Sequence, residues 1–149
     1  MKKIKLSIVI ISFNTQKILA NCLKSVYATL GNLSAEIIVV DNDSKDGSPE
    51  MVAKKFPKVI LLSNKKNRGF GQANNQGVAR SRGELVLLLN SDTIVHPQAL
   101  LRMVRYLETH PQVGVVGCKL LNADGTDQPS AGRFPTLSVS ALMLFGEHY

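Results

Sequence analysis

Residues 6–14 read LSIVIISFN, and this stretch decides the fold class. Four consecutive β-branched residues at 8–11, followed by the polar Ser12 and Asn14, are typical of a strand buried on both faces of a parallel sheet. Further strands are expected at 36–40, 59–62, 84–89 and 113–121, and helices at 15–30, 48–55, 69–82 and 97–107. A turn is expected at Asp124–Gly125 and a further helix at 137–145. Strands that alternate with helices predict an α/β fold, with a mostly parallel central sheet and helices on both faces.

The length of 149 residues and a hydrophobic content of 44% predict one folded domain over residues 1–149. We expect this domain to be incomplete, because the pattern weakens after residue 121 and stops without a closing element. No apolar run reaches the ~18 residues of a membrane span, and the apolar stretch near the N-terminus is too short for a signal peptide. These features predict a cytoplasmic protein, with the inner face of the membrane as a second location.

A net charge of +7, from 18 basic and 11 acidic residues, favours an anionic partner. The basic residues look scattered, aromatic residues make up only 5% and Trp is absent, which argues against nucleic acid. A phosphate-bearing small molecule and peripheral association with an anionic membrane both fit the charge, as does the simpler interpretation of a soluble basic surface. The two cysteines, Cys22 and Cys118, lie in apolar patterns and are expected to be buried free thiols.

Mostly polar residues follow four of the expected strands at the point where each strand ends. In an open parallel sheet, ligands bind beyond the carboxyl ends of the strands, so these residues are expected to share one site. They are Ser12, Phe13 and Asn14 after the first strand, Asp41, Asn42 and Asp43 after the second, Asn64, Asn67, Arg68 and Gly69 after the third, and Asn90, Ser91 and Asp92 after the fourth.

Asp92 is the candidate metal ligand of this set. It follows a strongly apolar strand, where a carboxylate is costly to desolvate unless it is paired or binds a metal. Asn90 and Asp92 occupy alternate positions and can point toward one site, and oxygen ligands with few carboxylates suit Mg²⁺ or Mn²⁺ shared with substrate phosphates. The alternative is that Asp92 caps the helix expected after Pro97.

Asp41 is the candidate base-binding residue. A carboxylate can accept the imide N–H of uracil or thymine, or the corresponding N–H of guanine, and Phe13 could lie against the face of the base. The alternative for Asp41 is a local turn within DNDSKDGS, where Asp46 and Gly47 are expected to have that structural role.

The polar helix expected at 69–82 contributes candidates for phosphate binding. Arg68 can bind a phosphate or stack beside a base, and Gly69 lets the backbone approach a ligand closely. Asn74 and Asn75 are poor helix formers in mid-helix, which suggests a packing or ligand role, and Asn75 is the nucleotide-binding candidate of the two. The glycines of this segment do not match the GxGxxG dinucleotide fingerprint and do not follow the first strand, which argues against an NAD-dependent oxidoreductase.

Four segments together resemble the family 2 glycosyltransferases of the GT-A fold, which is Rossmann-like, and among them the bacterial rhamnosyltransferase-like members. The segments are IVIISFNT, EIIVVDNDSKDGS, NKKNRGFGQANNQG and LLLNSDTIVHP, which cover roughly residues 5–120 in the order and spacing of the family. The later DGTDQPSAGRFPTL is also similar to that subgroup.

The resemblance implies an inverting transfer of a sugar from a UDP-, dTDP- or GDP-sugar to a hydroxyl of a glycan or lipid-linked acceptor, in cell-surface polysaccharide synthesis. Asp41 matches the base-binding Asp, and Asp92 the last Asp of a metal-binding DxD motif that reads Asn90-Ser91-Asp92 here. The general base is expected beyond residue 149, so no catalytic residue is assigned. The rival interpretations are a catalytically inactive nucleotide-binding module, an NAD-dependent oxidoreductase and a nucleic-acid-binding domain.

The resulting set of candidate residues combines the reasoning from strand ends with the resemblance. The nucleotide-binding candidates are Ser12, Phe13, Asn14, Asp41, Asp43, Arg68, Gly69, Asn75 and Asn90, and the metal candidate is Asp92.

Overall fold

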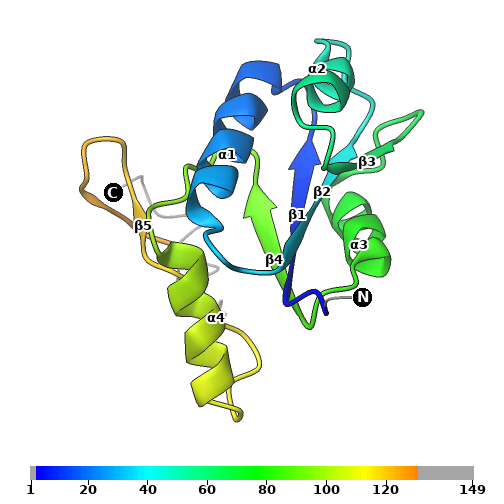
Figure 1. Ribbon diagram of the computed structural model, residues 1–149. Coiled ribbons are helices and arrows are strands. Elements are labelled where there is room, and N and C mark those ends of the chain that lie inside the picture. Colours follow the sequence, from blue (N-terminus) through cyan, green and yellow to red (C-terminus); the bar gives the residue numbers. More distant parts are fainter. Residues whose placement is uncertain (1–2, 131–149) are drawn as a thin grey trace, which may run out of the picture. The chain divides into compact units, whose positions relative to one another are not determined.

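Four parallel strands form the central sheet, in the order β3–β2–β1–β4 (Figure 1). The computed structural model describes residues 3–130, and the chain divides into two compact units, Met1–Val116 and Gly117–Tyr149. The first unit contains β1 (Leu6–Ser12), α1 (Gln16–Thr29), β2 (Ala35–Asp41), α2 (Ser48–Lys55), β3 (Ile60–Ser63), α3 (Phe70–Arg80), β4 (Leu85–Asn90) and α4 (Ala99–Thr109). The α/β fold class, the parallel sheet and the helices on both faces are therefore confirmed.

The sheet separates two hydrophobic clusters, one on each face. Successive residues of β1 point alternately into one cluster and the other. Ile8 and Ile10 of β1 belong to the larger cluster, with apolar residues of α1, α2 and α4, whereas Val9 packs with Ala73 of α3 on the other face. Figure 1 shows α1 and α3 on opposite sides of the strands. Because β1 is central and covered on both faces, its run of β-branched residues is almost wholly buried, as such a run predicts.

The β4 strand is strongly apolar in sequence but is exposed on one face. It is an edge strand among the described residues, and α3 covers β1 and β2 on the face to which Val86 and Leu88 point. These two side chains are 43% and 56% exposed. The apolar composition alone therefore does not distinguish an edge strand from a central one.

Gly77 allows α3 to lie directly on the sheet. A Cβ atom at this position would be 2.2 Å from Cγ1 of Val9, a distance at which one of the two elements must move. The close approach explains why this helix carries a glycine in its interior, where glycine ordinarily costs helix stability.

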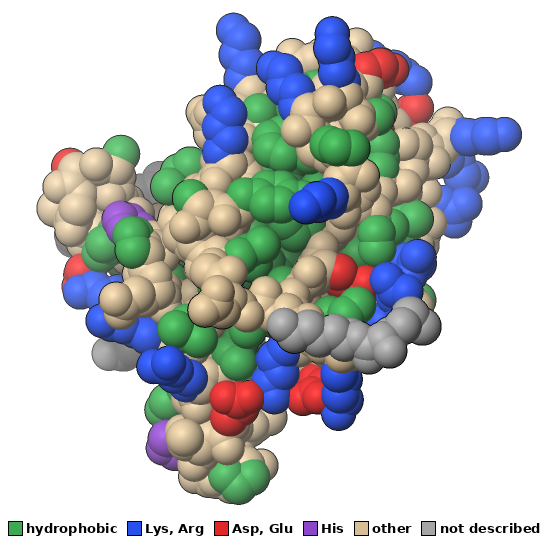
Figure 2. All heavy atoms as spheres, in the orientation of Figure 1, with side chains coloured by type: hydrophobic (Ala, Val, Ile, Leu, Met, Phe, Trp, Pro, Cys, Tyr) green, Lys and Arg blue, Asp and Glu red, His purple; other side chains and the backbone are tan. Residues whose placement is uncertain are grey.

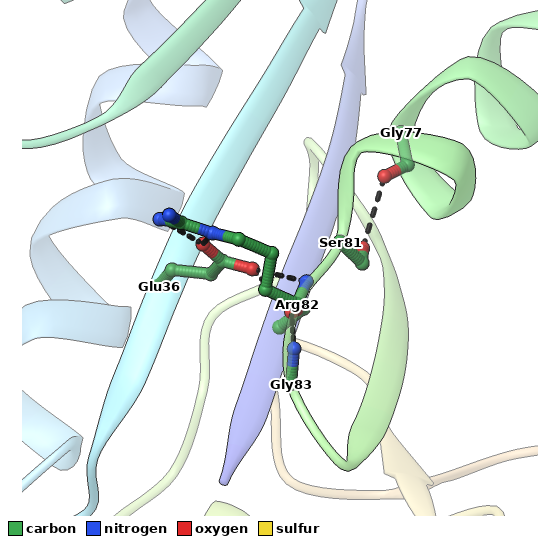
Figure 3. A network of polar contacts seen from close by, with 6 residues as sticks. Glu36, Gly77, Ser81, Arg82 and Gly83 are labelled. Atoms are coloured by element: carbon green, nitrogen blue, oxygen red, sulfur yellow. Dashed lines mark hydrogen bonds and ion pairs between the residues drawn. The ribbon is translucent and has the colours of Figure 1, made fainter. Parts of the chain in front are cut away.

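A buried polar network joins the amino-terminal parts of the strands (Figure 3). The carboxylate of Glu36 on β2 accepts a hydrogen bond from the Ser7 hydroxyl at 2.7 Å and from the Arg82 backbone N–H at 2.6 Å. The Gly83 backbone N–H donates to the Ser7 hydroxyl at 2.8 Å. The turn that leads from α3 into β4 is thereby fixed against β1 and β2.

The described part of the second unit is a short antiparallel hairpin of β5 (Leu120–Leu121) and β6 (Asp127–Gln128). The turn expected at Asp124–Gly125 is present, with Gly125 in the left-handed region at φ +84°. The expected strand at 113–121 is wrong except for β5, and Cys118 is exposed rather than buried. Cys22, in contrast, is fully buried on α1, as expected. A helix expected at 137–145 lies outside the described residues.

Helices able to cross a bilayer are not found among the described residues: each one is too short or too polar.

Candidate functional site

The strand register brings the carboxyl ends of all four parallel strands to one edge of the sheet. Ser12 of β1 pairs with Asp41 of β2, and Asp41 pairs with Ser63 of β3. On the other side of β1, Ile11 pairs with Asn90 of β4. The loops that follow these four strands therefore all start at the same end of the sheet, on adjacent strands. The sequence predicts this arrangement.

Asp41 is a buried carboxylate with one unsatisfied oxygen. The residue is 2% exposed at the end of β2, and its Oδ2 accepts the Ser44 backbone N–H at 3.0 Å. Its Oδ1 is buried and has no hydrogen-bond partner among the described residues. Buried polar atoms are ordinarily hydrogen-bonded. An unpartnered carboxylate oxygen at the carboxyl end of a strand is therefore suited to accept a hydrogen bond from a ligand.

Asn42 connects the loop after β2 to the loop after β3. Its Oδ1 accepts the Arg68 backbone N–H at 2.9 Å and the Asn64 amide at 3.2 Å, and its Nδ2 donates to Asn67 Oδ1 at 2.7 Å. The residue is 3% exposed. The sequence places Asn42 at this strand end but does not indicate its role. In the structure, Asn42 positions the loop that carries Arg68.

Asn14 connects the loop after β1 to the loop after β2. Its backbone N–H donates to Ser44 Oγ at 2.9 Å, and its Oδ1 accepts the Lys45 backbone N–H at 2.8 Å. Asn14 and Asp43 both adopt left-handed backbone conformations, with φ of +53° and +74°. The contacts of Asn14 hold the two loops together, and Asp43 forms an ion pair with Lys45 in its own loop.

Asp46 fixes the starts of two helices at this edge. Its Oδ2 accepts the backbone N–H of Gln16, the first residue of α1, at 2.8 Å. Its Oδ1 accepts the backbone N–H of Ser48, the first residue of α2, at 3.0 Å and the Ser48 hydroxyl at 2.6 Å. Burial opposes ionisation of Asp46, but these hydrogen bonds dominate and lower its pKa. The structural role expected for Asp46 agrees with this geometry.

A hollow of about 290 Å³ opens between the ends of β1 and β4 and the start of α3. Two exposed aromatic side chains, Phe13 and Phe70, face it, and Asp92 lies in its wall. The complete lining is Ile11, Phe13, Thr15, Phe70, Asn90, Ser91 and Asp92. Phe70 was not among the predicted residues, and its place as an aromatic residue at the start of a polar helix was the signal that could have found it.

Only some of the predicted residues line this hollow. Phe13, Asn90 and Asp92 line the hollow, whereas Asp41 and Arg68 do not. Arg68 has an exposed side chain on the loop after β3, and Ser12 is buried at the end of β1, where its hydroxyl lies 3.1 Å from Thr15 Oγ1.

Gly69 and Asn75 have different relationships to the site. Gly69 precedes α3 in a left-handed conformation at φ +80°, and its backbone N–H donates to Asn67 Oδ1 at 2.8 Å. Asn75 is exposed in the middle of α3. The neighbouring Asn74 is the buried asparagine of α3, with its Nδ2 donating to the Phe70 carbonyl at 3.0 Å.

The carboxylate of Asp92 contributes to the raised pKa of Cys22, the buried cysteine of α1. Burial and the negative charge of Asp92 raise the pKa of the Cys22 thiol to about 11. A thiol with such a pKa stays protonated at neutral pH, which argues against Cys22 as a nucleophile or a metal ligand.

Asp92 fits a divalent cation only if the substrate supplies further oxygens. No group of three His, Cys, Asp or Glu residues suited to a metal occurs within residues 3–130. Asp92 and Asn90 line the same hollow and are exposed. Mg²⁺ and Mn²⁺ commonly bind through one or two carboxylates together with substrate phosphates, so these residues fit that mode.

The comparison with protein families decides the classification. Residues 7–143 match Glycosyl transferase family 2. The chain belongs to this family. It is similar to the succinoglycan biosynthesis protein ExoO of Rhizobium meliloti, with 30% identity over 142 residues that cover 91% of this chain and 40% of ExoO. It is also similar to the N-acetylglucosaminyl-diphospho-decaprenol L-rhamnosyltransferase of Mycobacterium tuberculosis, with 28% identity over 113 residues, 68% of this chain and 36% of that protein.

Solved structures share the fold of this family 2 chain. The structure of residues 1–349 of S. aureus TarS matches with a TM-score of 0.65 and 24% identity over 72% of this chain and 33% of that one. The mannosyltransferase PcManGT from Pyrobaculum calidifontis, solved with GDP-Man and Mn²⁺, matches with a TM-score of 0.63 and 23% identity over 69% of this chain and 32% of that one. The expected family and fold are confirmed, and the chain spans two fifths or less of each of these four proteins.

Proposed function

We propose that this family 2 chain binds a nucleoside-diphosphate sugar, and that the protein to which it belongs transfers the sugar to an acceptor hydroxyl with inversion at the anomeric carbon. The observation that carries the proposal is the unpartnered Oδ1 of Asp41, which is buried at the same sheet edge as Asp92. A uracil, thymine or guanine N–H would supply the missing donor.

The loops around Asp41 are organised to hold the rest of the nucleotide. Asn42 fixes the backbone of Arg68, and the exposed Arg68 guanidinium is available to a phosphate. The amino-terminal end of α3, which follows Gly69 directly, favours negative charge. We therefore assign base binding to Asp41 and phosphate binding to Arg68 and the start of α3.

Asp92, with Asn90 beside it, would hold Mg²⁺ or Mn²⁺ against the diphosphate. A divalent cation bound there would neutralise the charge that develops on the leaving diphosphate. PcManGT, which was solved with GDP-Man and Mn²⁺, supports a divalent metal in this fold. We assign no general base to a described residue, because Asp124 hydrogen-bonds Thr126 within its own turn and Asp127 pairs with Lys119.

The acceptor is proposed to be a glycan or a lipid-linked sugar. The relative from Mycobacterium tuberculosis carries N-acetylglucosaminyl-diphospho-decaprenol in its name, and ExoO is named for succinoglycan biosynthesis. Both names support a role in the synthesis of cell-surface polysaccharide.

A peripheral contact with an anionic membrane is a further part of the proposal. The basic residues are less scattered than expected: the segment 51–83 contains eight Lys and Arg residues and no Asp or Glu. In the rest of the chain, ten basic residues face eleven acidic ones, so this segment accounts for the positive net charge. It forms most of α2, β3 and α3, and Figure 2 shows Lys and Arg side chains on the right-hand side of the molecule, where β3 and α3 lie, and at the top, where α2 lies beside α1.

The proposed donor site is tested by thermal unfolding of the 149-residue chain with UDP, dTDP or GDP, each with and without Mn²⁺. A ligand of the native state raises the unfolding temperature by mass action. We expect at least one nucleotide to raise it, with a larger rise in Mn²⁺. Asp92→Ala should abolish the Mn²⁺-dependent part, and Asp41→Ala should reduce the rise for the nucleotide itself.

Asp127→Ala is the control, since this exposed carboxylate is paired with Lys119 in the second unit. Its unfolding temperature should rise with nucleotide as in the parent chain. Equal responses of all three variants would show that the assigned carboxylates do not form the site. Co-sedimentation with vesicles containing phosphatidylglycerol, compared with neutral phosphatidylcholine vesicles, tests the membrane contact.

A further inference from the structure

The loop between β3 and α3, residues 64–69, has little apolar anchorage. Its sequence, NKKNRG, contains no apolar side chain, and every residue in it is exposed except Asn64, which is half-buried. A loop without buried apolar contacts keeps one shape only where hydrogen bonds hold it. The hydrogen bonds of this loop therefore determine where Arg68 lies.

Asn64 is the centre of a chain of side-chain amides that begins at Asn42 and ends at Gln76 in the middle of α3. Its Nδ2 donates to Asn42 Oδ1 at 3.2 Å and to Gln76 Oε1 at 2.9 Å, and its Oδ1 accepts Gln76 Nε2 at 3.1 Å. Its backbone N–H donates to the Asp41 carbonyl at 2.9 Å. The amide chain thus connects the end of β2 and the start of the loop to α3.

The reciprocal pair between Gln76 and Asn64 fixes the direction in which the Asn64 amide faces. A side-chain amide has a donor end and an acceptor end, and Gln76 is bonded to both ends of Asn64. Asn42 Oδ1 accepts both the Asn64 amide and the Arg68 backbone N–H. An Asn64 amide turned the other way would place its oxygen against Asn42 Oδ1, where two acceptors repel. Gln76 therefore supports the acceptor that holds Arg68.

The packing of α3 on the sheet does not depend on Gln76. Ala73 packs with Val9, and Gly77 lies directly against the same side chain. Gln76 is half-buried, both of its polar atoms bind Asn64, and it does not line the hollow beside Asp92. Its contacts thus point to the loop rather than to the core.

We infer that Gln76 is a positioning residue for phosphate binding: through Asn64 and Asn42 it holds Arg68 in place for the diphosphate of a nucleotide. The inference rests on the proposed function, which assigns phosphate binding to Arg68. A loop that already has its bound shape loses less conformational entropy when the ligand arrives, so it binds more tightly.

The test is a double-mutant cycle, measured by calorimetric titration of the 149-residue chain with whichever of UDP, dTDP and GDP binds the parent. The variants are Gln76→Ala, Arg68→Ala and the two combined. We expect Gln76→Ala to lower affinity about fivefold in the parent and less than about twofold in the Arg68→Ala background. Equal losses in the two backgrounds would show that Gln76 does not act through Arg68, and the inference would be overturned.

Urea denaturation of the same four proteins distinguishes positioning from a structural role. The Gln76–Asn64 pair does not involve the Arg68 guanidinium, so Gln76→Ala should lower the free energy of unfolding equally with and without that group. The effect on stability is thus additive, whereas the effect on affinity is not. A Gln76→Ala variant that is less stable but binds the nucleotide as tightly as the parent would overturn the inference.

Two further variants keep the comparison sharp. Asn64→Ala removes the amide pair from its other side and should lower affinity at least as much as Gln76→Ala, so parent-like binding would contradict the inference. Val78→Ala is the control on the same helix, because Val78 is 43% exposed and lies outside the amide chain. Its affinity should equal that of the parent, and circular dichroism confirms that each variant is folded.

Failure of the proposed function gives a different result. In that case none of the three nucleoside diphosphates binds the parent chain, or Arg68→Ala binds the nucleotide as tightly as the parent. Either outcome removes the phosphate-binding role of Arg68, and the inference falls with it. Additive losses in the cycle, in contrast, overturn the role of Gln76 alone.

Discussion

The carboxylate of Glu36 accepts three hydrogen bonds from a single residue, Arg82. The Arg82 backbone N–H donates to Oε1 at 2.6 Å, and its guanidinium donates to Oε2 through Nε at 3.2 Å and Nη2 at 3.0 Å. Glu36 is 8% exposed, whereas the Arg82 side chain is 59% exposed. The buried carboxylate therefore determines where the turn between α3 and β4 sits, and the solvent-facing guanidinium contributes less.

Glu36→Ala is expected to lower the free energy of unfolding by about 2 kcal/mol. The substitution removes the acceptor of the Ser7 hydroxyl and the shorter hydrogen bond of the Arg82 backbone N–H, which keeps only Ser7 Oγ at 3.2 Å. Urea denaturation followed by circular dichroism measures the change. Glu108→Ala is the control, because this exposed carboxylate pairs with Lys5 at the surface and should change stability by less than about 1 kcal/mol. Equal losses in the two variants would contradict the buried network as the cause.

The network also predicts how stability depends on pH. Burial opposes ionisation of Glu36, but hydrogen bonds from Ser7 and Arg82 dominate and lower its pKa below 4.5. A carboxyl group whose pKa is lower in the folded state stabilises that state above the unfolded pKa, and the contribution is lost as the pH falls through the folded pKa. The free energy of unfolding should therefore fall below about pH 4.5 more steeply in the parent chain than in Glu36→Gln. Parallel curves for the two proteins between pH 5 and pH 2.5 would show that Glu36 does not titrate as inferred.

Two glycines of the same helix allow a paired test of the packing of α3. Gly77→Ala places a Cβ atom 2.2 Å from Val9 Cγ1 and should destabilise the chain by about 1–3 kcal/mol. Gly71→Ala meets no atom within 4 Å and should be neutral or stabilising by up to about 1 kcal/mol, since alanine favours the helix. Chemical denaturation of both variants measures the difference. A Gly77→Ala variant as stable as Gly71→Ala would mean that α3 is not held against β1 as described.

Local pattern was enough to predict the elements of the first unit. The helix at 48–55 and the strands around 36–40 and 84–89 follow from apolar spacing and from signals such as Pro49, and they agree with the structure within a residue or two. The position of an element in the sheet depends on its neighbours instead. For this reason the exposure of Leu88 on the edge strand, and that of Cys118 outside any long strand, was not predicted.

The same distinction applies to the site. The polar ends of parallel strands predict one edge, and the register of Asp41 with Ser12 confirms that edge. Which of two adjacent asparagines points inward depends on helix phase, and the structure buries Asn74 and exposes Asn75. The contacts of Asn42 cross between loops more than 20 residues apart, and no local pattern indicates such a partner.

Asn42→Ala is expected to loosen the loop that carries Arg68. The variant loses the acceptor for the Arg68 backbone N–H and the donor to Asn67 Oδ1, which together should lower the free energy of unfolding by about 2 kcal/mol. Hydrogen exchange should increase at residues 64–69 and stay unchanged at 85–90, where β4 lies. Unchanged exchange in the loop would contradict the positioning role of Asn42.

Asp41→Asn separates stability from binding at the base site. The parent side chain buries a carboxylate whose Oδ1 has no partner among the described residues, which is unfavourable in the unliganded protein. An asparagine can keep the acceptor for the Ser44 backbone N–H while removing the charge, so the free energy of unfolding should stay equal or rise by about 1 kcal/mol. The new amide group cannot accept the N–H of a base, so affinity for the nucleotide that binds the parent chain should fall at least tenfold. Chemical denaturation and calorimetric titration of the same preparation test both expectations. A variant that is less stable and binds the nucleotide as well as the parent would show that Asp41 holds the fold rather than the ligand.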